Sequence, residues 1–490
     1  MQTNTRVGLG ALGAAALLGL LADGLLRAGP WGVNIGIWTV ALVAALLLLA
    51  RRQPIRLEGE GRWLLIPALL FALLFSWRDS TTLKVVDGLA LVIALGLAAV
   101  SGRIGGLRIA GVTTYVYYLL IAGLNAAFGP VLLLFSDIAW AEMPDWGWQR
   151  RAFAVGRGLL LALPLLLVFG ALFASADPVF AHYLSAVFQL DYDELCSHLL
   201  IILVCAWGVA GWLRGTLLRE EPVRGSRADR QWVALGGVEI VVVLGLLDLL
   251  FLAFVLIQMR ALFGGAALVR ATTGLTYAEY ARSGFFELVT ASALALPLLL
   301  LAHWLLRKER PAEERWFRLL AGGQVLLLFV IMASAVQRMH LYQMAYGLTE
   351  LRFYTLAFMG WLAALLALFV ATVMRGRRER FAFGALMSGF LAAAVLNVLN
   401  PDALIVGANI ANARAGHVFD VEYNTSLSAD AVPALAARLS VLPPPERQAA
   451  AEALRREAAL LAQSRDWRCW SVSRAQALQA TEQTTGAAKP

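Results

Sequence analysis

Charged residues are scarce in this sequence. They make up 15% of its 490 residues, whereas apolar residues make up 60%. A soluble globular domain has about 25% charged residues, so an ordinary water-soluble protein is excluded. Only three cysteines are present. Cys196 and Cys205 lie nine residues apart, which places them on opposite faces of a helix, and Cys469 stands alone. No disulfide framework or zinc site is expected.

Sequence signatures of common catalytic sites are also missing. No serine lies in a nucleophile-elbow pattern, and no glycine-rich loop carries the phosphate-binding lysine of a P-loop. His198 and His303 lack a ligand partner one helical turn away, and His182 and His340 lie in separate loops. We therefore predict no catalytic residues, no metal site and no cofactor, and we favour a protein that is not an enzyme.

The net charge of +8 does not indicate nucleic-acid binding, because the basic residues are not interleaved with aromatics on one face. They cluster instead in short loops between apolar runs, a pattern typical of the cytoplasmic loops of membrane proteins. The clusters lie at 51–62, 214–230, 307–318 and 375–380.

Long apolar runs fill residues 7 to 399, and most are long enough for a helix to cross about 30 Å of hydrocarbon. The sequence predicts an all-α, polytopic transmembrane helix bundle of about 11–12 spans. The lipid bilayer is then an expected partner, and the bacterial cytoplasmic (inner) membrane is the expected location. The predicted spans are 7–27, 31–50, 63–77, 85–101, 109–135, 156–175, 196–217, 233–258, 286–306, 317–337, 353–374 and 381–399.

The charges of the loops predict the orientation. The loop 176–195 has four acidic residues and no lysine or arginine, so it is expected outside, whereas the arginine-rich loops are expected inside. Three predicted spans separate the cytoplasmic loops 51–62 and 148–157, but two loops on one side need an even number. We expect the run 109–135 not to cross fully, because Gly129-Pro130 interrupts it. Eleven crossings, a cytoplasmic N-terminus and an external C-terminus follow.

The sequence divides into four parts by composition. Residues 1–150 form the N-terminal membrane helices and 151–400 the core membrane helices. Residues 401–480 form a small extramembrane region with mixed charge, in which Ala449 to Ala462 reads as an amphipathic helix and a second helix follows from Asp466. This region is too small for a large core of its own, so we expect it to pack on the membrane part. Residues 481–490 have a disordered composition.

Four stretches have more polar and aromatic residues than a plain bundle needs. They are FVLIQMRALFGG at 254–265, TYAEYARSGFFEL at 276–288, QRMHLYQMAYGLTELRFY at 337–354, and LNPDALIVGANIANARAG at 399–416 followed by SLSADAVPAL at 426–435. Together with ASADPVF at 174–180, they resemble the bacterial domain-of-unknown-function family 4173 and its relative 4153, which are multi-pass membrane proteins without an assigned activity. The resemblance covers roughly residues 150 to 440. It implies the architecture and supplies no mechanism.

With the predicted orientation, these stretches all lie on the external side. They contain the candidate residues for binding a small polar ligand or a lipid headgroup. The alternative is structural, with Glu and Arg pairing across loops and the tyrosines forming an interfacial belt. We also expect the second and third stretches to exchange charges, because Glu350 and Arg352 diverge on a helix and one needs a partner elsewhere. The candidates are Asp177, Gln258, Tyr277, Glu279, Tyr280, Arg282, His340, Glu350 and Arg352.

Asp248 lies near the middle of its predicted span. An acidic residue at membrane depth suggests a function, such as a proton relay. A hydrogen bond to a neighbouring helix is the structural alternative. In either case the side chain is expected to face the bundle.

Three functions remain open on this basis. We favour a non-catalytic integral membrane protein with a binding or regulatory role on its outer face. A secondary transporter of a small solute needs a site at the midplane, for which Asp248 and the interrupted run 109–135 are the only indications. A membrane-embedded enzyme acting on a lipid or envelope precursor needs a close cluster of polar residues, which only the external stretches could supply.

Overall fold

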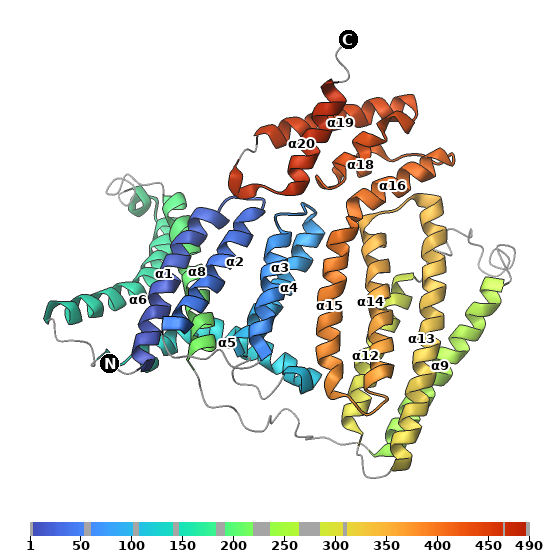
Figure 1. Cartoon of the computed structure of the whole chain (residues 1–490), viewed down its shortest axis with the longest axis horizontal. Helices are drawn as coiled ribbons and strands as arrows, with labels where there is room; N and C mark the ends of the chain where they lie inside the picture. The colour runs from blue at the N-terminus through green and yellow to red at the C-terminus, as the bar shows by residue number, and fades with distance from the viewer. Residues whose placement is uncertain are drawn as a thin grey trace.

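Long helices stand side by side in this molecule, and a smaller helical unit covers one end of them (Figure 1). The computed structural model describes residues 3–52, 60–100, 107–140, 147–182, 192–218, 236–263, 285–306, 311–463 and 466–486. The regular elements in these ranges are helices. Ten of the described helices are long and apolar enough to cross a membrane. The predicted all-α polytopic bundle is therefore confirmed.

The long helices match the predicted spans closely, because length and hydropathy alone mark a membrane helix. Two of the twelve helices named below are not among the ten: α6, and the shorter α3, which with the turn of 3₁₀-helix before it covers Gly61–Leu74. The helices are α1 (Thr3–Leu26), α2 (Val33–Arg52), α3 (Leu65–Leu74), α4 (Thr81–Val100), α5 (Val112–Leu132), α6 (Gly147–Ala176), α8 (Tyr192–Leu217), α9 (Gly237–Phe263), α12 (Phe285–Leu305), α13 (Pro311–Tyr346), α14 (Glu350–Thr372) and α15 (Glu379–Leu399).

Three apolar clusters hold the bundle together. One joins α1, α2 and α8, a second joins α3, α4 and α15, and the third joins α9, α12, α13 and α14. Because α15 packs on both α4 and α14, it connects the two halves of the bundle. Polar pairs add to this packing, as between α1 and α8, where His198 Nδ1 lies 2.6 Å from Asp23 Oδ2.

Helix α5 runs along the lower end of the bundle as drawn in Figure 1. Its middle part, at Leu119 and Ala122, contacts α4 near Gly96, four residues from the end of that helix. Its later part, from Asn125, contacts α8 at Gly211 and Gly215. The segment after it reaches the first turns of α1, where Ala139 N donates to Thr5 Oγ1 at 3.2 Å. These contacts all lie in the lower half of the neighbouring helices. Val112–Asp137 is itself one of the ten segments long and apolar enough to cross a membrane, so the expectation that this run does not cross fully stays a prediction.

Pro130 lies inside α5 and has no N–H to donate, so one hydrogen bond of the helical ladder is missing there. The α-helix nevertheless runs on to Leu132, and the chain continues as a π-helical turn over Leu133–Asp137. Asp137 then receives the Nε–H of the buried Arg214 at 2.5 Å. Above Pro130 and Leu134, helices α1, α6 and α8 line an open apolar pocket of about 460 Å³.

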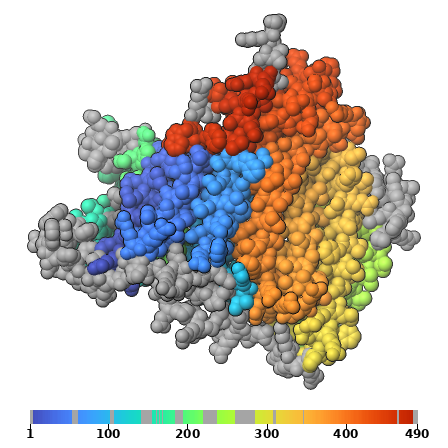
Figure 2. All heavy atoms as spheres, viewed as in Figure 1, coloured from blue at the N-terminus to red at the C-terminus, as the bar shows by residue number. Residues whose placement is uncertain are grey.

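A helical cap covers the upper end, as Figure 2 shows in orange-red and red. We call residues 401–463 and 466–486 the cap. It has a small apolar core of its own and, as expected, packs on the membrane part. The predicted helix 449–462 lies within α19, whereas the segment from Asp466 starts as a 3₁₀ turn before α20. The cap helices are α16 (Pro401–Arg414), α17 (Val421–Ser426), α18 (Val432–Ala437), α19 (Pro444–Gln463) and α20 (Val472–Gly486).

Candidate functional site at the junction of bundle and cap

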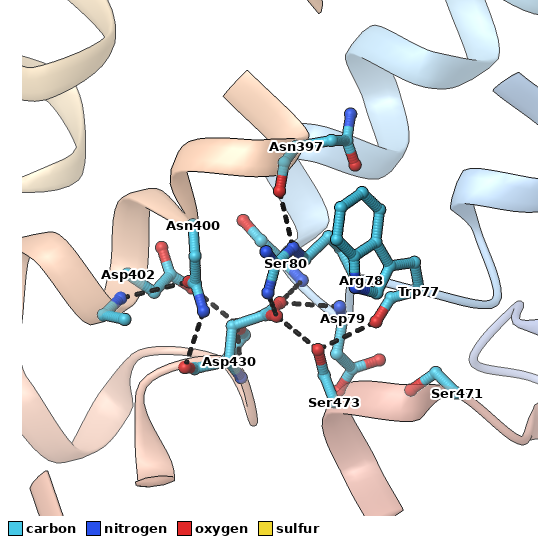
Figure 3. A network of polar contacts seen from close by, with 12 residues as sticks. Trp77, Arg78, Asp79, Ser80, Asn397, Asn400, Asp402, Asp430, Ser471 and Ser473 are labelled. Atoms are coloured by element: carbon cyan, nitrogen blue, oxygen red, sulfur yellow. Dashed lines mark hydrogen bonds and ion pairs between the residues drawn. The ribbon is translucent and has the colours of Figure 1, made fainter. Parts of the chain in front are cut away.

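Asp430 is the centre of a polar network between the bundle and the cap (Figure 3). It lies just before α18 and is 3% exposed. Its Oδ2 accepts the backbone N–H groups of Asp79 at 2.6 Å and Ser80 at 2.8 Å, while Ser473 from α20 donates to Oδ1. Arg78 Nη1 lies 3.3 Å from the same oxygen. One carboxylate thus binds the loop between α3 and α4 to two parts of the cap.

Arg78 extends this network to the end of α15. Its Nε donates to the backbone oxygen of Asn397 at 2.7 Å, and Nη2 reaches that of Val398 at 3.5 Å. The last carbonyl groups of a helix have no intrahelical partner, so a buried guanidinium satisfies them. The guanidinium also stacks on Trp77, 4.6 Å from the ring centroid. Because the side chains of Arg78 and Asp430 are 9% and 1% exposed, this ion pair is shielded from water.

A second buried pair lies just below, inside the membrane bundle. Asn397 Nδ2 on α15 donates to Asp87 Oδ1 on α4 at 2.8 Å, and also to its own helix at Ala393 O. Asp87 is 1% exposed and Asn397 is fully buried. The other oxygen of Asp87, Oδ2, and the amide oxygen of Asn397, Oδ1, have no hydrogen-bond partner.

Asp402 lies at the start of α16. The preceding Asn400 adopts a left-handed conformation and caps the helix, its side chain accepting Ala403 N at 3.2 Å. Ser428 donates to Asp402 Oδ2. Burial raises the pKa of Asp402 to about 6; the bond from Ser428 opposes this rise, and the nearby carboxylates of Glu350 and Asp430 add to it.

Glu350, at the first turn of α14, faces this junction and is half-buried. Its carboxylate accepts a long hydrogen bond of 3.4 Å from Thr82 Oγ1, and its backbone N–H donates to Tyr423 OH at 2.7 Å. It interacts electrostatically with Asp402 and with the hydroxyl of Tyr354. Three acidic groups therefore gather here, of which Asp430 has the cation Arg78 against it.

The motif YGLTELR forms the turn between α13 and α14, which the cap holds in place. Asn409 on α16 accepts the N–H of Leu348 at 2.7 Å and donates to its carbonyl at 3.0 Å, as a neighbouring backbone would. Gly347 has a φ of +74°, and a Cβ there would lie 2.9 Å from Asn409 Oδ1. Glycine fits both requirements.

Glu350 and Arg352 diverge, as their spacing predicts. The Arg352 guanidinium turns back to the end of α13, donating to the carbonyls of Gly347 and Tyr346, and stacks on Tyr342 at 3.9 Å from the ring centroid. Its contacts are therefore local. The predicted exchange of charges with TYAEYARSGFFEL concerns Glu279 and Arg282, which lie outside the described residues, as do the candidates Tyr277 and Tyr280.

The other external candidates do not gather around Glu350. Asp177 is exposed after α6 and accepts the N–H of Val179. Helices α6 and α13 lie at opposite ends of the long axis in Figure 1, so Asp177 and the exposed His340 are far apart. Gln258 is buried on α9, with its Nε2 unpartnered. The site is thus built from Glu350 and residues outside the candidate list.

Asp248 lines an open groove between α9 and α13. The groove has a volume of about 670 Å³ and is otherwise apolar. The carboxyl faces α13 at Gly323, where an added Cβ would lie 3.6 Å from Oδ2, and Oδ1 has no hydrogen-bond partner. Asp248 therefore lies against a neighbouring helix at the edge of the bundle.

The most important residues of the junction, Arg78 and Asp430, were not among the sequence candidates. A signal for Arg78 exists: the segment SWRDS places two charges between apolar runs where no basic cluster occurs. Asp430 lies within SLSADAVPAL, one of the four polar stretches, and Asn397 lies at the predicted outer end of its span. Their pairing with Arg78 could not be read from the sequence.

The family described as a domain of unknown function, DUF4153, matches residues 65–437. The chain belongs to this family. The match begins well before residue 150, the limit of the resemblance in motifs, and it contains Arg78, Asp87, Asn397, Asp402 and Asp430. Comparison with curated proteins and with solved structures gave no match.

Proposed function

We propose that this member of the DUF4153 family is a protein of the bacterial cytoplasmic membrane that acts by binding, not catalysis, on its outer face. Eleven helices cross, α5 lies at the inner surface, and the cap lies outside. The distribution of arginine supports this orientation, because excess Lys and Arg in short loops marks the cytoplasmic side. Figure 1 shows the end of α2, the start of α13 and the connection of α14 to α15 at the lower end of the bundle. The arginines on these segments and just before α3 are Arg51, Arg52, Arg62, Arg315, Arg318, Arg375, Arg377, Arg378 and Arg380.

Labelling in intact cells tests the orientation. In a variant without native cysteines, Val418→Cys on the cap should react with an impermeant thiol reagent. Arg377→Cys, in the loop between α14 and α15, should react only after the cells are permeabilised. Both positions are exposed, Val418 to 92%, so accessibility within the protein is matched. Equal labelling of both in intact cells would contradict the orientation.

The ligand that fits the outer face is a small cation or a lipid headgroup with an ammonium group. The observation that carries this proposal is the state of Glu350: its carboxylate has one long hydrogen bond, from Thr82, and two buried acidic groups beside it. Arg78 is already bound by Asp430 and the carbonyls of α15. An ammonium group would donate hydrogen bonds to Glu350 and offset the surplus of negative charge.

Ethanolamine is a suitable probe, and ethylene glycol is its neutral counterpart of similar size. We expect ethanolamine to raise the unfolding temperature of the purified protein, and ethylene glycol to leave it unchanged. Glu350→Gln should abolish the shift, whereas Glu422→Gln, at an exposed acid on the cap, should keep it. Nanodiscs with and without phosphatidylethanolamine then distinguish a headgroup from a free solute. A shift that survives Glu350→Gln would refute this site.

A secondary transporter is the second candidate. The observation in its favour is Asp248, because an acid that borders an open groove at membrane depth can bind a proton or a cationic solute. The helix breaks typical of transporters would then be represented by Pro130 in α5. Proton-driven uptake by proteoliposomes, lost in Asp248→Asn, would favour this reading over the first.

A further inference from the structure

Asp87 and Asn397 form a contact that is incomplete as it stands. Each side chain has two polar atoms, and one hydrogen bond joins the two side chains, from Asn397 Nδ2 to Asp87 Oδ1. The remaining two atoms, Asp87 Oδ2 and Asn397 Oδ1, are both acceptors, and both lack a partner on side chains that are at most 1% exposed. Buried polar atoms without partners are rare in native proteins, and each needs an explanation. Two acceptors that belong to touching side chains point to a missing donor.

The nearby cations do not supply this donor, because both are engaged elsewhere. Arg78, in the loop above, binds Asp430 and the carbonyls of Asn397 and Val398. Lys84, one turn earlier on α4, lies 2.6 Å from Asp79 Oδ1.

The neighbouring elements offer Asp87 little else. Helix α14 directs Glu350 to Thr82, and α3 packs at this level through the aromatic side chain of Phe75 beside Gly88. Within the part of the chain that the structure describes, the polar partner of the Asp87 carboxyl is thus the amide of Asn397.

We infer that the pair Asp87–Asn397 is a proton-binding site. A proton from the outer aqueous side bonds to Asp87 Oδ2, the carboxylate becomes a neutral acid, and its O–H is available to Asn397 Oδ1. Hard metal cations take about six oxygen ligands, whereas two unpartnered oxygens are present here, so a proton fits better. A neutral acid also avoids the cost of a charge at membrane depth.

The position of the site connects it to the cap. Asp87 lies six residues from the start of α4, so about 9 Å below the upper end of the bundle. Asn397 uses its side chain for Asp87 and its carbonyl for Arg78, which in turn binds Asp430. A single residue, Asn397, therefore links Asp87 to the ion pair that fastens the cap. This inference does not depend on a ligand at Glu350.

Infrared spectroscopy of the full-length protein in nanodiscs tests the inference. At neutral pH, the spectrum should contain a carboxylic-acid C=O band that shifts in D₂O and loses one component in Asp87→Asn. Asp177→Asn, which changes an exposed aspartate, should leave the band unchanged. An Asp87→Asn spectrum with the complete band would show that Asp87 is ionised and overturn the site.

Two further measurements test whether the pair binds Na⁺ instead of a proton, and cover the case in which Asp87→Asn does not accumulate. Exchange of sodium for choline at constant pH should not alter the band; a component that appears only without sodium would show that the pair binds Na⁺ instead. If Asp87→Asn does not accumulate, Asn397→Leu keeps the acid but removes its acceptor. The Asp87 component should then move to higher frequency, and an unchanged band would again overturn the inference.

Discussion

Asp430→Ala should destabilise the protein by about 3–5 kcal/mol, the cost of removing one partner of a buried ion pair. The guanidinium of Arg78 would stay buried without its carboxylate, and the N–H groups of Asp79 and Ser80 would lose their acceptor. We expect a lower unfolding temperature in detergent and faster proteolysis within the cap. Glu422→Ala, which removes an exposed acid from the same cap, is the control and should differ little from the parent protein.

The double variant Arg78→Leu/Asp430→Leu distinguishes the loss of the ion pair from the effect of any substitution at these two positions. Because it leaves no unpaired charge, it should cost less than the sum of the two single substitutions. Strictly additive effects would show that the two residues act independently. An Asp430→Ala protein whose cap resists proteolysis as well as the parent would contradict the role of Asp430 as the fastening point.

The membrane helices could be predicted because the information is local. A run such as 381–399 is apolar over the length of a span, and α15 indeed covers Glu379–Leu399. The polar contacts are different. Arg78 and Asp430 are 352 residues apart in sequence, and Asp87 and Asn397 are 310 apart. No spacing rule relates such residues, so the network became visible only once the helices were arranged in space.

The candidate residues show the same limit at a smaller scale. The spacing of Glu350 and Arg352 correctly predicts that their side chains diverge on a helix. It does not say that Arg352 returns to the carbonyls at the end of α13, or that Glu350 meets Thr82. The density of polar residues therefore correctly identified the end of the bundle at which the site lies. The partners of Glu350 and Arg352 depended on which elements lie next to α14.

Gly211→Ala is expected to be the most damaging small substitution on α8. A Cβ at this position would overlap the backbone oxygen of Asn125 and lie 2.8 Å from Ala126 Cα in α5. Backbone atoms cannot move aside as a side-chain tip can, so α5 would have to lift from α8. Overpacking of this kind costs about 1–3 kcal/mol, and Arg214 and Asp137, which meet just beyond the contact, would be drawn apart.

Gly208 provides the matched control, because it lies one turn earlier on the same helix and a Cβ there would meet nothing within 4 Å. Gly208→Ala removes the same helix-destabilising glycine, so it should be neutral or slightly stabilising. The difference in unfolding temperature between the two variants measures the close approach of α5. If both variants unfold alike, α5 does not lie on α8 at Gly211, and the packing that draws Asp137 to Arg214 is not as described.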